Sequence, residues 1–374
     1  ASSIVLEYVG SSTPTLQLLY AYIGYAIAFL FRPIGAFCFG CIGDLYGRKK
    51  ALLSSMLLMS MATLALAFIP SVQVLGLSAT LLFFVCRIAQ GLAVGGEYGT
   101  AMTYAYEFNA YRRTFHGACI ISSTHLGGIF ASFLAGMYIE NFRFTFLLGG
   151  LIGLALLFFR SFIKEYHGDG PKKILEITTE SIKNKKAILE AIMVASMLVL
   201  VFYGSLIYVN EIVHKELGIP RSQIFKANSL LLGLWIVLPP CFGYIADKYT
   251  FSYRKMMRLG AIGVFLSAPL LGLSVVFACY PAIIFTQIVV HLFHMIFCSC
   301  TPRFFGDLFA SSARNTALST SYSLGASFTA ALAPMICHVS ITIFHTNFAL
   351  CLPFMIVALA SLFVLKKEII YAKG

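Results

Sequence analysis

The sequence predicts an all-α membrane protein whose helices cross the bilayer eleven times. Of its 374 residues, 59% are hydrophobic and only 11% are charged, whereas soluble domains carry about 25% charged residues. With so few charged residues, the chain does not have enough polar surface to cover an exterior that faces water. Apolar runs of roughly 20 residues, the length that crosses a bilayer, recur along the chain. In lipid such runs form helices, because a helix pairs its own backbone N–H and C=O groups.

Eleven apolar stretches have this length and are expected to span the membrane. In chain order they cover about residues 15–40, 51–70, 75–105, 115–138, 144–163, 188–209, 226–246, 257–278, 282–302, 317–343 and 347–365. A charged segment at 164–187 separates the fifth span from the sixth and is typical of a linker with a surface helix. The predicted domains are therefore an N-terminal transmembrane bundle at 1–163, the linker, and a C-terminal six-helix bundle at 188–374.

The distribution of basic residues predicts the orientation of the chain. The formal net charge is +12, and most of the 27 lysines and arginines fall in loops on one side of the predicted spans. By the positive-inside rule, residues 40–50, 164–187 and 366–374 lie in the cytoplasm, while 1–13 and 210–222 lie outside. Because the basic residues mark topology, no nucleic-acid partner is expected. The expected surrounding is the lipid bilayer, and the expected state is a monomer.

A short charged motif, GCIGDLYGRKK, separates the first two spans. Gly40 lets a neighbouring helix approach closely, and Asp44 is placed to face a helix N-terminus, where negative charge is stabilising. Gly47 permits a sharp turn. The two following bases, Arg48 and Lys49, are expected at the membrane interface, paired with acids of neighbouring segments. The motif is either a latch between two helix bundles or a charged turn that only sets topology.

A weaker copy of this motif stands in the second half of the chain. It reads GYIAD at residues 243–247, so that Asp247 corresponds to Asp44. Internal repeats of this kind are common in transporters. Asp247 is therefore predicted to belong to the same gating motif.

Polar side chains within the spans are candidates for a proton and solute pathway, because charges are costly in lipid. Arg87, Gln90, Glu97 and Tyr98 lie near one face of a single helix. Glu97 is either a proton carrier, since a carboxyl group in a dry cavity prefers its neutral form, or a structural acid. In the structural reading it caps a neighbouring helix or pairs with Arg32.

Two further pairs of polar residues share helix faces. Tyr203 and Asn210 either line a cavity or satisfy helix–helix contacts, and His291 and His294 are expected to line the pathway by hydrogen bonding. No acidic partner or zinc spacing accompanies these residues or the ten cysteines. The sequence therefore predicts no metal and no cofactor. A nucleophile elbow and a P-loop are also missing, so no catalytic residue and no enzyme activity are expected.

Five motifs in order along the chain resemble the major facilitator superfamily. Gly40, Asp44, Gly47, Arg48 and Lys49 match its GxxxDxxGR[KR] signature, and Arg87-Ile-Ala-Gln90-Gly91 is similar to its RxxQG motif. The resemblance to metabolite:proton symporters, which include proline/betaine and dicarboxylate transporters, rests on Arg32-Pro33-Ile-Gly35, Gly95-Gly96-Glu97-Tyr98, Glu107 and Arg113. Asp307-Leu-Phe with Arg314 resembles the acidic stretch between helices ten and eleven of the family.

The resemblance implies two pseudo-symmetric bundles that work by alternating access, with family helices 1, 4, 7 and 10 lining the path. Family members have twelve helices, so the spans correspond to helices 2–12 and the first is missing. A proton-coupled symporter of a small polar metabolite or osmolyte, of proline/betaine or carboxylate type, is implied. Its place would be the bacterial inner membrane, with the C-terminus in the cytoplasm. The alternatives are a truncated remnant that does not transport, and a channel or membrane sensor.

Overall fold

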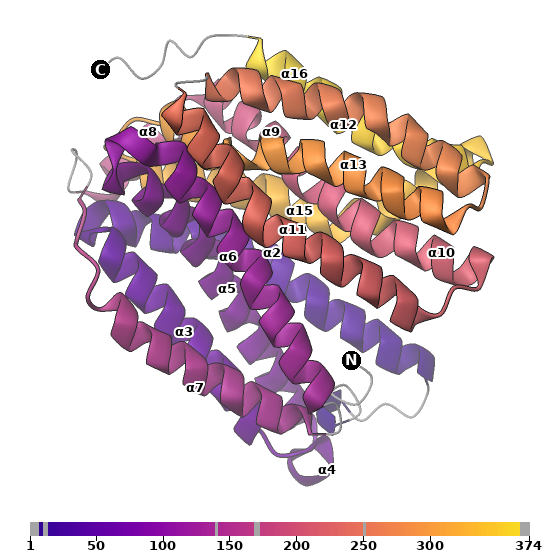
Figure 1. Ribbon diagram of the computed structural model, residues 1–374. Coiled ribbons are helices and arrows are strands. Elements are labelled where there is room, and N and C mark those ends of the chain that lie inside the picture. The colour runs from indigo at the N-terminus through magenta and orange to yellow at the C-terminus, as the bar shows by residue number, and fades with distance from the viewer. Residues whose placement is uncertain (1–6, 10–13, 139–140, 168–172, 250–251, 367–374) are drawn as a thin grey trace. The chain divides into compact units, whose positions relative to one another are not determined.

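The described part of the chain is almost entirely helical. The computed structural model describes residues 7–9, 14–138, 141–167, 173–249 and 252–366, and no strand occurs among them. Figure 1 shows long helices joined by short loops. Parts of the predicted termini and linker lie outside the described residues, namely 1–6, 10–13, 168–172 and 367–374.

Eleven helical segments among the described residues are long and apolar enough to cross a membrane, which confirms the predicted number of spans. They are Ala26–Tyr46, Arg48–Phe68, Leu77–Phe108, Ala110–Leu134, Phe142–Arg160, Lys185–Leu217, Arg221–Lys248, Tyr253–Val276, Tyr280–Leu308, Arg314–Phe344 and Asn347–Leu365. Several helices continue past the apolar run that predicted them. The span expected at 188–209, for example, continues to Leu217, because polar residues extend the helix beyond its apolar part.

The chain forms two compact units. The first contains Ala1–Ala101, Phe130–Lys183 and Ser311–Ser327, and the second contains Met102–Ile129, Asn184–Ala310 and Phe328–Gly374. Each unit takes segments from both sides of residues 164–187, so the predicted division into two bundles at that linker stays a prediction.

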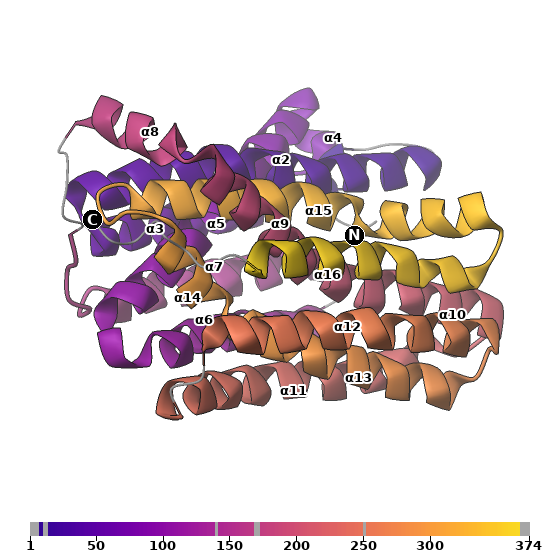
Figure 2. The ribbon, with the colours of Figure 1, turned by 90° about the horizontal axis from the view of Figure 1, so that it is seen from above.

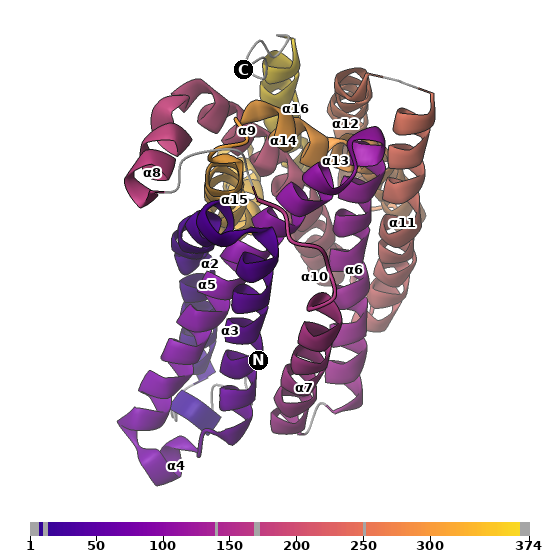
Figure 3. The same ribbon diagram turned by 90° about the vertical axis from the view of Figure 1, so that its left-hand side faces the viewer.

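The first unit is built from early helices and the start of a late one. Its elements are α2 (Pro14–Tyr46), α3 (Arg48–Phe68), α4 (Val72–Leu75), most of α5 (Leu77–Phe108), α7 (Phe142–Arg160), α8 (Ile174–Lys183) and the first turns of α15 (Arg314–Phe344). Helix α3 packs along α7. Figure 3 shows α8 as a short separate helix near α2, where buried Ile177 packs with Cys41 and Ala313.

The second unit packs around α12 (Tyr253–Val276). This helix lies beside α13 (Tyr280–Ser299) in Figure 1 and beside α16 (Cys351–Leu365) in Figure 2. The other elements are η1 (Ala110–Arg112), the first part of α6 (Arg113–Met137), α9 (Lys185–Tyr203), η2 (Gly204–Val209), α10 (Asn210–Leu217), α11 (Arg221–Lys248), α14 (Thr301–Leu308), the end of α15, and η3 (Asn347–Leu350). Helix α9 runs into α10 through one π-helical turn, η2.

Candidate gating contacts and solute pathway

The carboxylate of Asp44, at the end of α2, caps the N-terminus of α15. Its two oxygens accept hydrogen bonds from the backbone N–H groups of Asn315 (3.2 Å) and Thr316 (2.8 Å), and the Thr316 hydroxyl donates a third at 2.7 Å. A helix N-terminus carries unpaired N–H groups and a partial positive charge, so an acid there is stabilising. Asp44 thus lies against a helix start of the kind that the sequence analysis expected.

Arg48, which was expected at the membrane interface, has a buried side chain. The side chains of Arg48 and Asp44 have no exposed surface, and Arg48 Nη1 lies 2.6 Å from Asp44 Oδ1. The same Nη1 donates to the carbonyl oxygen of Gly43 at 2.6 Å. Arg48 therefore pairs within its own motif, because the one-residue turn at Gly47 folds α3 back onto the end of α2. Such a buried pair is costly to break by removing one partner.

Glycines make this approach possible. A Cβ atom on Gly40 would lie 2.7 Å from the Cα of Thr316, closer than real Cβ atoms come to backbone. Gly47 has a φ of +104°, a conformation that glycine adopts without strain. The turn is held from outside by the segment after α7: the backbone N–H of Lys49 donates to Glu165 Oε1 (2.8 Å), and that of Arg48 to the carbonyl of Tyr166 (2.9 Å).

The second unit repeats the capping geometry with Asp247. Its Oδ2 accepts a hydrogen bond from the backbone N–H of Phe115, in the first turn of α6, at 2.8 Å. Four residues earlier on α11, a Cβ atom on Gly243 would lie 2.9 Å from the carbonyl oxygen of Thr114. Gly-x-x-x-Asp therefore performs the same task twice: the glycine admits a helix start and the acid caps it.

The two copies differ in the cation that faces the acid. Asp247 Oδ1 pairs with Arg303 of α14 at 3.2 Å, and the Arg303 side chain is 32% exposed. In the first copy the partner is Arg48, which is fully buried. The contact between Arg303 and Asp247 was not predicted, because the two residues lie 56 positions apart in the chain.

On α5 the predicted polar face breaks into two separate groups. Arg87 donates to Gln90 Oε1 (2.7 Å) and to the carbonyl of Gly24 (3.2 Å), and Gln90 donates to the Thr63 hydroxyl at 3.0 Å. Glu97 forms an ion pair of 2.7 Å with Arg160, at the end of α7. Tyr98 packs against Tyr322 of α15, with ring centroids 4.8 Å apart.

Arg160, rather than Arg32, is the cation that pairs with Glu97. The side chains of Glu97 and Arg160 are 28% and 32% exposed, so water reaches the pair. The guanidinium of Arg32 lies over the Phe29 ring, 3.8 Å from its centroid. Arg160 escaped the sequence analysis because it was counted among the bases that mark the cytoplasmic side.

An aromatic cluster in the second unit surrounds the two predicted histidines. Trp235 of α11 donates its indole N–H to His291 Nδ1 at 3.2 Å, and its ring lies edge-on to His294, 5.2 Å away. On its other face Trp235 stacks on His125 of α6, with centroids 4.6 Å apart and planes inclined by 17°. His291 and His294 have no exposed surface. No three His, Cys, Asp or Glu side chains in the described ranges are placed to hold a metal ion.

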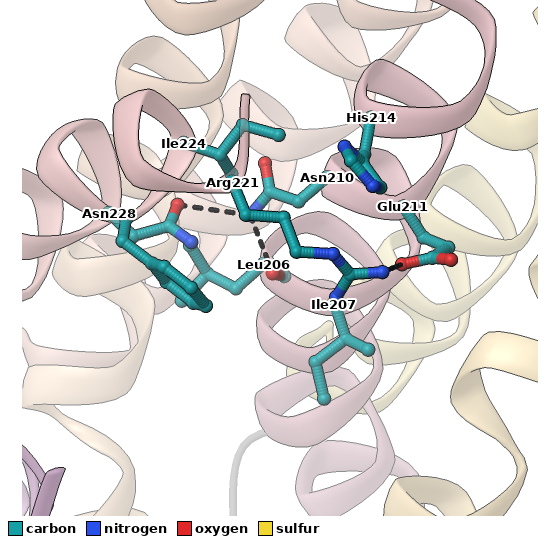
Figure 4. A pocket seen from close by; sticks show the side chains of 9 residues that line it. Leu206, Ile207, Asn210, Glu211, His214, Arg221, Ile224 and Asn228 are labelled. Atoms are coloured by element: carbon teal, nitrogen blue, oxygen red, sulfur yellow. Dashed lines mark hydrogen bonds and ion pairs between the residues drawn. The ribbon is translucent and has the colours of Figure 1, made fainter. Parts of the chain in front are cut away.

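Asn210 lines a pocket with both polar and apolar walls, whereas Tyr203 is in contact with the neighbouring Phe202 ring. The pocket has a volume of about 210 Å³ and lies between the η2–α10 segment and the start of α11. Figure 4 shows Asn210 beside Asn228, and Arg221 reaching toward Glu211. Asn228, Glu211 and Arg221 were missed by the sequence analysis, because they lie near or within a predicted outer loop where charge is ordinary.

These features define a class of protein: a polytopic membrane transporter with an internally repeated helix-capping motif. The profile of the Major Facilitator Superfamily matches residues 1–277 of the chain. The chain therefore belongs to the Major Facilitator Superfamily and is a multi-pass membrane transporter, not an enzyme.

Relatives of this chain carry transporter names. A Staphylococcus aureus protein called "Putative proline/betaine transporter" is 27% identical over 343 residues, which cover 86% of this chain and 72% of that protein. The shikimate transporter of Escherichia coli is 24% identical over 362 residues, which cover 91% of this chain and 82% of its own length. The alpha-ketoglutarate permease of E. coli is 27% identical over 277 residues, covering 70% and 63%.

Solved structures share the fold. The proton:xylose symporter XylE of E. coli superposes with a TM-score of 0.77 at 16% sequence identity, covering 98% of this chain and 90% of XylE. The human organic anion transporter MFSD10 gives a TM-score of 0.72 at 14% identity, covering 97% and 88%.

Proposed function

We propose that the protein is a proton-coupled symporter of a small polar metabolite or osmolyte, of proline/betaine or carboxylate type. The observation that carries the proposal is the ion pair between Glu97 and Arg160, at 2.7 Å and partly open to water. A carboxylate beside a cation favours its ionised form, and one that loses the cation into a drier site favours its neutral form. A conformational change that separates the pair therefore changes proton affinity, which links proton and solute movement.

The capping contacts of Asp44 and Asp247 supply the matching gate. Asp44 accepts three hydrogen bonds from the start of α15, and Asp247 accepts one from the start of α6 beside its ion pair with Arg303. The charge–dipole part of such a contact is worth about 0.3–1 kcal/mol at the surface and up to ~2 kcal/mol when partly buried. A contact of this free energy can be broken during a transport cycle, yet it is large enough to favour the conformation in which it is formed.

We propose the predicted topology as the setting of this cycle. Residues 40–50, 164–187 and the C-terminus face the cytoplasm of a bacterial cell, residues 210–222 face outward, and the protein works as a monomer in the inner membrane. The basic loops support this orientation. Labelling of a cysteine placed at position 164 by an impermeant reagent, from outside intact cells, would contradict it.

The coupling test uses purified protein in proteoliposomes with labelled proline, glycine betaine and alpha-ketoglutarate. With an inward proton gradient the parent should accumulate one of them, and Glu97→Gln should not. Exchange of labelled for unlabelled solute, which needs no net proton movement, should remain measurable in Glu97→Gln. The matched control is Glu180→Gln, which removes an exposed acid paired with Lys183 on α8 and should transport like the parent.

Two outcomes contradict the proposal in different ways. Gradient-driven accumulation by Glu97→Gln at the parent rate would remove Glu97 from coupling. If the parent neither accumulates nor exchanges any of the three solutes, the result favours the alternative of a protein that folds without transporting them.

A further inference from the structure

The pocket beside the π-helical turn is lined by polar residues that have no role in the capping contacts or in the Glu97–Arg160 pair. It is lined on one side by Asn210 and Glu211 of α10 and on the other by Arg221 and Asn228 of α11. All of these belong to the second compact unit. An acid, a base and two amides thus converge on one small cavity of about 210 Å³. Drug-sized ligand pockets are typically about 300–1,000 Å³, so this one suits a smaller solute.

The π-helical turn shapes the floor of the pocket. The backbone N–H of Asn210 donates to Ile207, three residues back, and its side-chain amide donates to the carbonyl of Leu206 at 2.6 Å. Buried Gln287 of α13 donates to the carbonyl of Ser205 at 3.1 Å. Two side-chain amides therefore bond to carbonyls of this one turn. Such turns are rare and occur frequently at functional sites.

The charged wall of the pocket is loosely paired. Arg221 Nη2 lies 3.4 Å from Glu211 Oε2, Lys215 Nζ lies 3.2 Å from Glu211 Oε1, and all three side chains are exposed. Exposed pairs of this kind contribute about 0–1 kcal/mol, so a ligand that offers each partner a better one replaces the contact at little cost. Asn210 and Asn228, joined at 3.0 Å, add amide donors and acceptors beside it (Figure 4).

We propose that this pocket is a binding site for a small zwitterion. The pocket would bind the solute at the outer end of α10 and α11, before transport begins. The ligand's carboxylate pairs with the Arg221 guanidinium, which suits planar two-pronged recognition. Its ammonium lies toward Glu211 and the exposed ring of Phe225, since aromatic faces attract cations. The apolar side chains of Ile207 and Ile224 contact the ligand's carbon atoms. The inference rests on the proposed function for the class of solute, whereas the pocket's geometry is independent of it.

The test measures binding without any gradient, by calorimetry on the full chain in lipid nanodiscs. Glycine betaine and proline are the zwitterionic probes, choline is a cation without a carboxylate, and succinate is an anion without an ammonium. The parent should bind the zwitterions more tightly than either comparator. Arg221→Gln should weaken betaine binding about tenfold, the effect of one charge-assisted contact, and leave choline unchanged. Glu211→Gln should weaken betaine and choline but not succinate.

Lys226→Gln is the matched control, because it removes an exposed base from the same helix without touching the pocket. It should bind like the parent. Parent-like betaine and proline affinity in both Arg221→Gln and Glu211→Gln overturns the inference, as does a parent that binds neither zwitterion. Accumulation that persists with unchanged affinity in the pocket variants leaves the proposed symport standing and removes the pocket. If the parent binds the zwitterions through the pocket but does not accumulate solute, the binding site stands and the proposed symport is contradicted.

Discussion

Thr316 is bonded to Asp44 twice, through its backbone N–H at 2.8 Å and through its hydroxyl at 2.7 Å. The residues lie 272 positions apart, yet one side chain satisfies two donors at the start of α15. Because Asp44 also neutralises buried Arg48, the contact belongs to a three-part arrangement of cation, anion and helix start. A substitution of Asp44 alone should therefore change the stability differently from a joint substitution of Asp44 and Arg48.

The buried pair predicts that a double variant is more stable than a single one. Asp44→Asn removes the carboxylate that lies 2.6 Å from the buried Arg48 guanidinium, and breaking a buried pair by removing one partner typically costs about 3–5 kcal/mol. Asp44→Asn with Arg48→Met also removes the buried positive charge, so the double variant should recover part of the lost thermal stability. Both should lose transport, because neither restores the charged cap. Melting temperatures in detergent and solute exchange rates measure the two effects, and equal melting of the single and double variants would refute the burial argument.

Close approach predicts opposite effects at two glycines of α11. A Cβ on Gly243 meets the Thr114 carbonyl and the Phe115 Cα within about 3 Å, whereas nothing lies within 4 Å of one on Gly233. Gly243→Ala should therefore weaken the Asp247 cap and lower stability by about 1–3 kcal/mol, the usual cost of overpacking. Gly233→Ala should be neutral or stabilising by up to about 1 kcal/mol. Thermal unfolding of the two variants side by side decides the matter.

Removal of the Glu97 partner predicts a loss of gradient-driven accumulation. Arg160→Gln breaks the 2.7 Å ion pair with Glu97, so it should impair accumulation more than exchange of labelled for unlabelled solute. Arg143→Gln, which removes a partly exposed base paired with Glu7 instead, is the control and should transport like the parent. Accumulation by Arg160→Gln at the parent rate would contradict the assignment.

A buried hydroxyl predicts a stability loss at Tyr8. This side chain has no exposed surface, donates to the carbonyl of Leu66 at 2.5 Å and stacks on Phe83. Tyr8→Phe should cost about 1–3 kcal/mol, because the buried carbonyl loses its donor.

Burial raises the pKa of the Tyr8 hydroxyl above its usual value of 10.0. Its stabilising effect is therefore complete below pH 10 and is lost as the pH rises through the higher folded-state pKa. The stability difference between the parent and Tyr8→Phe should shrink in that alkaline range. A difference that grows with pH would show that Tyr8 stabilises as the anion.

Hydropathy predicted the spans because each is decided by its own residues: an apolar run of this length has no alternative to a helix in lipid. The positions of Asp44 and Asp247 were equally visible, since the spacing to the preceding glycine repeats. Their partners were not. That Thr316 and Phe115 lie at these helix starts depends on how distant helices pack, which no local pattern encodes.

The partners of two charged residues were not predictable from the sequence. Arg48 was expected at the membrane interface and its side chain is buried, and Glu97, for which Arg32 was one of the partners considered, pairs with Arg160. Long cationic side chains reach several residues from their own Cα, so sequence position says little about where the charge ends. The π-helical turn at Gly204–Val209 likewise has no marker in an apolar run.

The stack of Trp235 on His125 gives the protein its own spectroscopic probe. Trp235 is the single tryptophan of the chain and is almost completely buried between α6, α9 and α13 side chains. Its emission therefore comes from one site that water does not reach. Separation of α6 from α11 would expose the indole to water and shift the emission to longer wavelength. Motion around Asp247, farther along the same α11, is thus observable in real time with ultraviolet light and no attached dye.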